Sequence, residues 1–250
     1  MRVGFSKITI TPPLPVQMAG YGVERPANAI ADELHARALV CEHEGRTVAL
    51  LTADLLWLER RHLRVLRQRV EELTGIPGDH FMAAASHTHS GPDTMDWFHF
   101  APVDPQWLQV LLRQLAGAVY LATQNLRPAR LERHVGEVGI AVNRRVHSAR
   151  EGYRIGMNLD GPVDQTLTAL RILDEEGAYL GAVLHHATHP VVLGGASRVI
   201  SADWPGEMCR LVEATLGGTC LFVNGACGDI NPRVGAGRTY AEVLRVGRQA

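Results

Sequence analysis

The sequence predicts an α/β protein, a layered mixed β-sheet flanked by helices. Short apolar runs that end at Gly or Pro are spaced along the chain, and segments with helical periodicity lie between them. The chain has 250 residues, of which 46% are hydrophobic and 20% charged, as is typical of a globular protein with a sizeable core. We therefore expect one domain over residues 1–250. Its last segment has a helix-forming composition and ends without Gly or Pro, so we expect the domain to continue past residue 250.

The first half of the chain is expected to form strands and one helix. The strands are expected over residues 3–11, 34–41, 46–53 and 81–85, and the helix over 55–74. Glu44-Gly45 joins the second and third strands, which predicts a hairpin. Apolar residues recur every three or four positions along the helix, and Gly75 marks its end.

The second half is expected to begin with a helix from Pro105 to about Asn125, with Asp104 as its N-cap. Strands are expected over residues 131–144, 166–173, 179–184 and 219–223, with a loop over 153–164. The turn at residues 174–177 predicts a second hairpin. Further helices are expected to open at residues 201–206 and at 239.

A pair of histidines follows the buried strand at residues 81–85. His87 and His89 are two positions apart, and residues at that spacing on a strand point to the same side. Gly91-Pro92 then turns the chain away. Two neutral imidazoles on one side form half of a zinc site, although the motif by itself names neither the metal nor the reaction.

Three strand ends carry polar residues followed by Gly or Pro. They comprise residues 87–89, 185–190 and 224–232. Because strand ends at one edge of a sheet converge, these segments are candidates for a single site. His87 and His189 are the leading zinc ligands, and His89 and Asp54 come next. Alternatively, His189 does not bind zinc and only forms an orienting hydrogen bond.

Other residues allow a structural as well as a functional reading. Asp54 is interpreted as a partner that orients a histidine, a second-metal ligand or a helix N-cap, and Asp203 as a further N-cap. The loop at 225–232 is either a nest of backbone N–H groups for an oxyanion or a tight glycine turn. Arg144 either binds a substrate oxygen or lies on the surface. The aromatic residues at 97–100 either line a substrate cleft or belong to the core.

Composition and charge limit the partners and the locations that we expect for this protein. A formal net charge of −1 gives no electrostatic reason to expect nucleic acid as a partner. No run of about 18 apolar residues is present, so no membrane span is expected. The four cysteines lack metal-site spacing and are expected to be reduced. No signal peptide is visible at the N-terminus, which favours a cytoplasmic location. Assembly into a homo-oligomer is left open.

Several motifs occur together along the chain. They are G-F-S-K-I-T-I-T-P-P followed by A-G-Y-G, H-A-R-A, A-S-H-T-H-S-G-P, V-N-R, A-T-H-P, S-A-D-W-P-G and N-G-A-C-G-D-I-N-P. In content and order they resemble the N-terminal catalytic region of the neutral/alkaline (non-lysosomal) ceramidases. The resemblance implies a single catalytic domain that uses zinc to hydrolyse the amide bond of a small-molecule N-acyl substrate.

The resemblance also implies roles for individual residues. His87 matches the family's first zinc histidine and His189 the second. His89 matches an active-site histidine near the zinc-bound water. Arg144 matches the arginine of the family's N-R motif, which is expected to bind a substrate oxygen.

Two departures from the family pattern limit what is carried over. Ceramide-cleaving members have Ser in a G-D-x-S-P motif, whereas this chain has Asn231 after Asp229, in a loop expected to shape the pocket. An amide cannot act as a hydroxyl group, so a substrate other than ceramide is favoured. The family also supplies a Glu and a Tyr as zinc ligands from a downstream region, and nothing in this chain matches them. The alternatives are another H-x-H metallohydrolase, or a degenerate homologue or fragment that binds a ligand without turnover.

Overall fold

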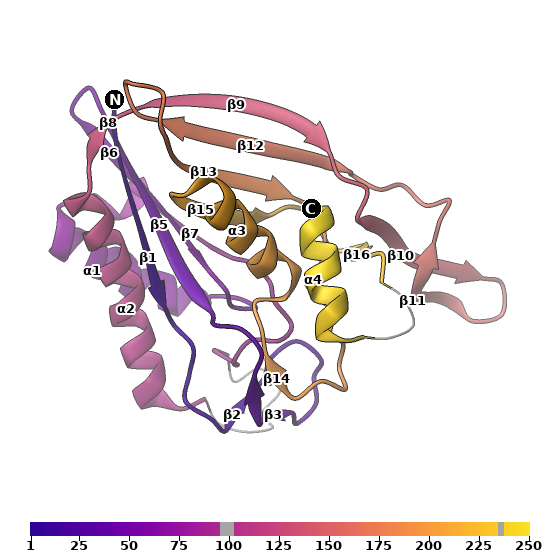
Figure 1. The fold of residues 1–250 in the computed structure, drawn as a ribbon. Helices are drawn as coiled ribbons and strands as arrows, with labels where there is room; N and C mark the ends of the chain where they lie inside the picture. The colour runs from indigo at the N-terminus through magenta and orange to yellow at the C-terminus, as the bar shows by residue number, and fades with distance from the viewer. Residues whose placement is uncertain (96–102, 235–237) are drawn as a thin grey trace.

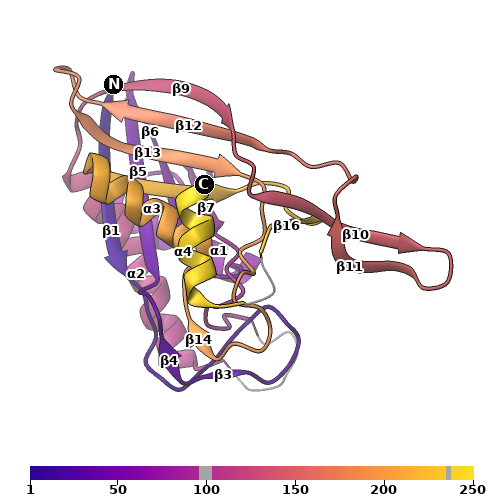
Figure 2. The ribbon, with the colours of Figure 1, turned by 45° about the vertical axis from the view of Figure 1, so that its right-hand side comes forward.

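Two β-sheets pack face to face between two helical layers (Figures 1 and 2). The computed structural model describes residues 1–95, 103–234 and 238–250. The first sheet has the strand order β7-β6-β5-β1-β8 and the second has the order β15-β13-β12-β9. The predicted α/β class with a layered mixed sheet and flanking helices is confirmed.

The first sheet is built mainly from the N-terminal third of the chain. Its strands are β1 (Arg2–Thr9), β5 (His35–His43), β6 (Arg46–Ala53), β7 (Phe81–Ala85) and β8 (Arg127–Pro128). β6 and β7 run parallel, and the other pairs are antiparallel. β5 alternates between two cores: Val40 packs toward the helices and Leu39 toward the second sheet. Strands covered on both faces have near-continuous apolar sequences for this reason.

The second sheet contains β9 (Arg130–Glu137), β12 (Thr166–Leu173), β13 (Tyr179–His186) and β15 (Thr219–Asn224). β13 and β15 are parallel, so both strands end at the same edge. Between the two sheets, Val3 and Leu39 of the first pack with Val183 and Leu221 of the second. This shared core fixes the ends of β7 and β13 relative to each other.

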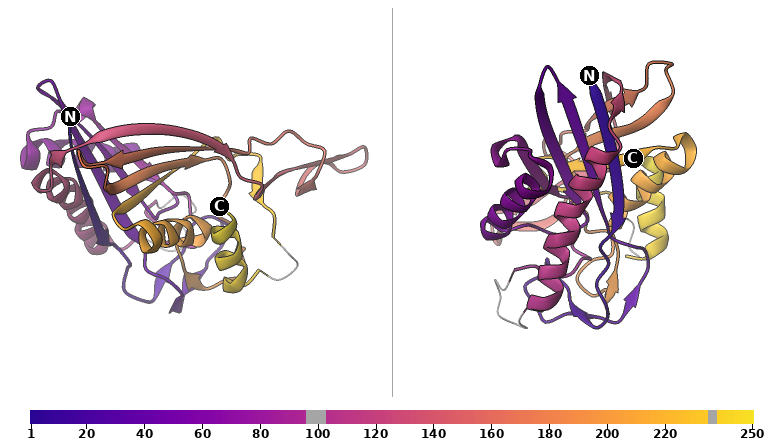
Figure 3. Two further views of the ribbon diagram at one scale, coloured as in Figure 1. Left: turned by 45° about the horizontal axis from the view of Figure 1, so that its top comes forward. Right: turned by 90° about the vertical axis from the view of Figure 1, so that its left-hand side faces the viewer.

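Helices cover the outer face of each sheet (Figure 3). The helices α1 (Arg60–Thr74) and α2 (Pro105–Gln124) pack on the first sheet, and α3 (Asp203–Leu216) and α4 (Tyr240–Gln249) on the second. A 3₁₀ turn, η1 (Gly78–His80), leads into β7. Within the described residues, no helix combines the length and the apolar character needed to cross a bilayer.

Short strands complete the fold around one end of the molecule. β2 (Val16–Gln17) pairs with β3 (Pro26–Ala27), and β4 (Ala29–Ile30) with β14 (Val199–Ile200). A third sheet contains β10 (Ala141–Ser148), β11 (Gly152–Asn158) and β16 (Ile230–Pro232). The β10–β11 hairpin projects from the body of the molecule (Figure 1).

Three sequence predictions of secondary structure are wrong. The strand expected over 131–144 is two strands in different sheets, because the chain turns at 138–140. The loop expected over 153–164 contains β11, whose apolar residues alternate but face solvent. The helix expected from residue 55 begins at Arg60. The aromatic segment 97–100 lies outside the described residues.

The predicted N-cap of α2 is confirmed and gives a first testable prediction. The Asp104 carboxylate accepts hydrogen bonds from the backbone N–H groups of Gln106 and Trp107, at 2.8 and 3.2 Å. We expect Asp104→Ala to lower the free energy of unfolding by about 1 kcal/mol, because two helix N–H groups lose their acceptor. Urea denaturation measures this, with Asp160→Ala at an exposed loop position as the control. Equal stability of the two variants would contradict the capping role.

Candidate metal centre

Three histidine side chains from two strand ends meet at one edge of the fold. His87 and His89 follow β7, and His189 follows β13. One ring nitrogen from each lies within 4.8 Å of the others. The ring centroids are 4.9 to 5.4 Å apart. The strand ends that the sequence grouped together therefore do converge.

Hydrogen bonds to backbone carbonyls hold the two strand ends against each other. The Asn224 side chain at the end of β15 donates to the Ser86 carbonyl at 3.0 Å, which joins the second sheet to the first. The His89 N–H donates to the Pro190 carbonyl at 3.1 Å. His87 has a left-handed backbone with φ 71°, which turns the chain sharply after β7. The relative position of the histidines is thus set by the backbone and by the Asn224 side chain.

Two of the three imidazoles have a defined tautomer. The Nδ1 atom of His87 is 2.9 Å from the Leu56 carbonyl, and that of His189 is 2.5 Å from the Cys227 carbonyl. A carbonyl oxygen only accepts, so each Nδ1 carries the proton and donates it. Each Nε2 then keeps its lone pair. A histidine that ligates a metal through Nε2 usually donates its Nδ1–H to a carbonyl or carboxylate oxygen, which fixes the orientation of the ring.

The third imidazole completes the arrangement. The Nε2 atoms of His87 and His89 are 3.4 Å apart. Two nitrogen ligands at a tetrahedral angle, with zinc–nitrogen bonds of about 2.0–2.1 Å, lie about 3.3–3.4 Å from each other. The donor set of three imidazoles is also the set that catalytic zinc accepts while keeping one open position. The residues present therefore fit a zinc ion.

Burial keeps these imidazoles neutral. Burial first, and then the nearby His87 and His189 rings, lower the pKa of His89 to about 3. Burial and the Arg144 guanidinium lower the pKa of His189 to about 4. Burial also lowers the pKa of His87. Because only the neutral ring can bind a metal, the site is ready for one at neutral pH.

Arg144 lies at the rim of this group. Its Nε donates to the Gly228 carbonyl at 3.1 Å, and its Nη1 to the Asn231 side-chain oxygen at 3.4 Å. Burial lowers the pKa of Arg144. The Asp229 carboxylate accepts from the Asn143 side chain at 3.4 Å, and its backbone carbonyl accepts the Arg144 N–H at 2.7 Å. Arg144, Asp229 and Asn231 are thus brought together beside the histidines.

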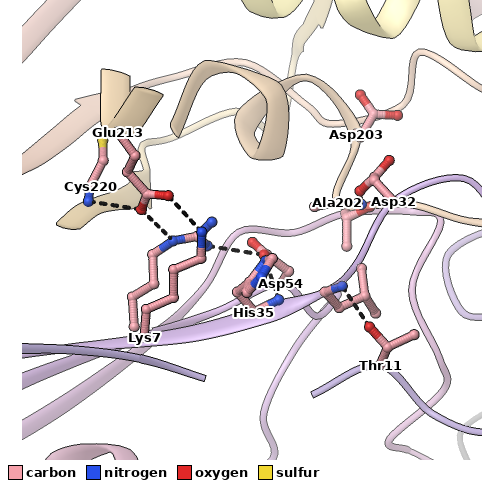
Figure 4. Close-up of polar contacts among 12 residues, drawn as sticks. Lys7, Thr11, Asp32, His35, Asp54, Ala202, Asp203, Glu213 and Cys220 are labelled. Carbon is pink, nitrogen blue, oxygen red and sulfur yellow. Dashed lines mark hydrogen bonds and ion pairs between the residues drawn. The ribbon is translucent and has the colours of Figure 1, made fainter. Parts of the chain in front are cut away.

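Asp54 is not part of the histidine group, contrary to its interpretation as a ligand or an orienting partner. Its carboxylate accepts from the His35 N–H at 2.9 Å and forms an ion pair with Arg37 at 3.1 Å (Figure 4). Arg37 also pairs with Glu213 at 3.4 Å, and Lys7 pairs with Glu213 at 2.6 Å. Nor is Asp54 an N-cap, because α1 begins only at Arg60. Arg37 is buried and needs a negatively charged partner, which Asp54 provides. The arginine within the apolar H-A-R-A-L run was the feature of the sequence that could have indicated this pair.

Other candidate residues have structural roles. His186 is held between the Thr166 carbonyl at 2.9 Å and the Thr188 hydroxyl at 3.0 Å, as expected for a structural histidine. Asp203 is the first residue of α3 rather than its N-cap, which is Ala202. In the loop at 225–232, the N–H groups of residues 225, 227 and 230 donate to backbone carbonyls, and Gly225 and Gly228 do not have positive φ. The expected turn with glycines at positive φ is therefore wrong, whereas the nest of backbone N–H groups stays a prediction.

Sequence reasoning missed the residues that surround His89. They are Gly20, Tyr21 and Arg25. They lie in a loop rich in Gly and Pro whose pattern predicts no contact with residue 89. The A-G-Y-G motif contains two of them, but no periodicity pointed to their partner.

Comparison with known proteins points to one family. A sequence profile described as "Neutral/alkaline non-lysosomal ceramidase, N-terminal" matches residues 1–240. A neutral ceramidase from Drosophila melanogaster is 27% identical over 93% of this chain and 36% of its own length. One from Pseudomonas aeruginosa is 29% identical over 93% of this chain and 37% of its own length.

The fold has solved counterparts. The crystal structure of a neutral ceramidase from Pseudomonas aeruginosa superposes with a TM-score of 0.85 at 22% identity, over 99% of this chain and 43% of that one. A structure titled "Ceramidase complexed with C2" gives a TM-score of 0.84 at 23% identity, over 99% of this chain and 42% of that one. The chain spans well under half the length of these relatives. It belongs to the neutral/alkaline non-lysosomal ceramidase family, whose N-terminal region it matches.

Proposed function

We propose that this chain is a zinc-dependent hydrolase that cleaves the amide bond of an N-acyl substrate. The observation that carries the proposal is the convergence of three neutral imidazole nitrogens within 4.8 Å. His87 and His189, whose Nδ1 atoms donate to carbonyls, present Nε2 to the ion. His89 supplies the third nitrogen, so the chain holds zinc with its own side chains. This extends the two-histidine site that the sequence implied.

The residues around the histidines supply the rest of the chemistry. A zinc ion bound here provides a water of lowered pKa that can attack an amide carbonyl. Arg144 is held at the rim by Gly228 and Asn231, and its remaining donors can bind the substrate carbonyl oxygen as negative charge develops there. Asp229 supports Arg144 through its backbone carbonyl. The water that adds to the carbonyl carbon supplies the proton that the departing amine takes up as the C–N bond breaks.

The substrate is proposed to be an N-acyl compound other than ceramide. Asn231 stands where ceramide-cleaving relatives have Ser, and its amide oxygen accepts from Arg144. An amide at that position offers no hydroxyl group and orients the guanidinium instead. A changed partner for Arg144 changes which substrate oxygen the site recognises.

Two measurements test the proposal. Elemental analysis of the purified chain is expected to find about one equivalent of zinc, since three imidazoles are a full protein donor set. Hydrolysis of a panel of N-acyl amino acids, N-acyl amines and ceramide is expected to show turnover that chelation removes and zinc restores. Zinc below about a tenth of an equivalent, even after incubation with the metal, would refute the metal site. Binding without turnover would favour the non-catalytic alternative, and efficient ceramide cleavage would overturn the Asn231 argument.

A further inference from the structure

Arg25 is a fully buried cation without an acidic partner. Its exposed fraction is 0%, and no Asp or Glu in the described part of the chain pairs with it. Burial lowers the pKa of Arg25 to about 10, which leaves it charged at neutral pH. An unpaired buried charge is costly unless other polar groups solvate it. The contacts that solvate this guanidinium therefore indicate what it does.

Backbone carbonyls from three segments surround the guanidinium. Its Nη2 donates to the carbonyls of Ala19 and His89, at 2.6 and 2.5 Å. Its Nη1 lies 3.4 Å from the carbonyls of Gly194 and Ser197. Arg25 thus ties its own loop and the segment after β13 to the backbone of His89. A planar fork of five donors reaches carbonyls on different sides of the guanidinium, whereas a lysine offers three donors at a single point.

The same loop also packs against the His89 ring. The Tyr21 and His89 rings meet edge to face with centroids 5.1 Å apart, and the Arg25 guanidinium lies 4.7 Å from the centroid of the Tyr21 ring. Gly20 has φ 110°, and a Cβ there would lie 2.5 Å from Nδ1 of His89. The ring of His89 is therefore enclosed by a glycine backbone on one side and an aromatic edge on another.

His89 differs from the other two histidines in how it is oriented. His87 and His189 each donate Nδ1–H to a carbonyl, whereas Nδ1 of His89 is buried without a hydrogen-bond partner. Apart from the 3.4 Å contact between its Nε2 and that of His87, the ring orientation of His89 therefore comes from packing and from its backbone. We infer that Arg25 is a positioning residue that, through Tyr21 and the His89 carbonyl, holds the His89 imidazole toward His87 and His189. The effect on zinc affinity rests on the proposed function, but the positioning itself does not.

Ring NMR signals of the full chain, labelled with ¹⁵N-histidine and kept in chelator, test the positioning directly. In Arg25→Met and Tyr21→Leu we expect the His89 ring signals to shift or broaden, because the ring loses its fixed surroundings. The His186 signals report on the fold and should stay unchanged, since its partners are Thr166 and Thr188. Tyr21→Phe is the matched control, because the Tyr21 hydroxyl is buried without a hydrogen-bond partner. It should leave His89 as in the wild type, and Arg25→Lys should have an intermediate effect.

The outcomes separate this inference from the proposed function. Unchanged His89 signals in folded Arg25→Met and Tyr21→Leu proteins would overturn it, even if the chain binds zinc. If Arg25→Met does not fold, Tyr21→Leu alone decides. Where the wild type binds zinc, competition with a chromophoric chelator should show affinity falling by about 10-fold to 100-fold in Arg25→Met, as for other residues that orient a ligand. Wild-type protein without zinc affinity would refute the proposed function and leave the NMR result to stand.

Discussion

Replacing His189 by alanine is expected to abolish zinc binding and hydrolysis together. His189 comes from the second sheet, and its Nε2 is directed by the hydrogen bond from Nδ1 to the Cys227 carbonyl. Without it, two imidazoles from one strand end remain, and two nitrogen ligands hold zinc weakly. Zinc content by elemental analysis should fall from about one equivalent to below about a tenth. His87→Ala should behave in the same way.

His185→Ala is the matched control for this experiment. His185 lies in the same segment of the chain but is exposed and outside the histidine group. It should retain zinc and activity. Full zinc retention in both His87→Ala and His189→Ala would contradict the ligand assignment. Melting curves of each variant in chelator show whether a loss of zinc is a loss of fold.

The largest effect on stability is expected at Asp54 rather than at the histidines. The Asp54 and Arg37 side chains are 6% and 4% exposed, and their closest atoms are 3.1 Å apart. Asp54→Asn removes the negative charge while Arg37 stays buried, where removal of one partner costs about 3–5 kcal/mol. Glu213 still pairs with Arg37 at 3.4 Å, so the lower end of that range, about 3 kcal/mol, is expected. Urea denaturation measures the loss.

A double variant checks the cause of that loss. Arg37→Met combined with Asp54→Asn removes both charges and leaves Glu213 paired with Lys7 at 2.6 Å. It should be more stable than Asp54→Asn alone, because the buried cation that lost its closest partner is no longer present. Folded Asp54→Asn should keep its zinc. Loss of zinc without loss of stability would show instead that Asp54 serves the metal.

Much of the fold followed from local patterns. The β7 strand over residues 81–85, both hairpins and the capped start of α2 are confirmed, because each rests on neighbours in the sequence. β11 was missed because its segment is polar and rich in Gly, and its alternating residues Tyr153 and Ile155 lie exposed on a projecting hairpin. Alternation is informative only where one face is buried, and the sequence does not say which faces the sheets cover.

The candidate site was likewise predicted only in part. The convergence of His87, His89 and His189 was predicted from strand ends at the edge of one sheet, whereas the histidines come from two sheets that pack face to face. Asp54 could not be assigned, because its partner Arg37 was not recognised as a buried cation. Arg25 lies in an irregular loop, and contacts made by such loops depend on tertiary structure that no periodic pattern encodes.

The bond from the Asn224 side chain to the Ser86 carbonyl has a consequence for how the protein folds. It joins the two sheets directly beneath the histidines, and the ligands come from both sheets, about a hundred residues apart in the chain. Each sheet can form its own hairpins early, but the ligand set is complete only when the two docked halves share one core. A folding intermediate in which only one sheet has formed would lack the complete ligand set and would not bind the metal. Zinc uptake would then report the last docking event of folding, and bound zinc would slow the separation of the halves.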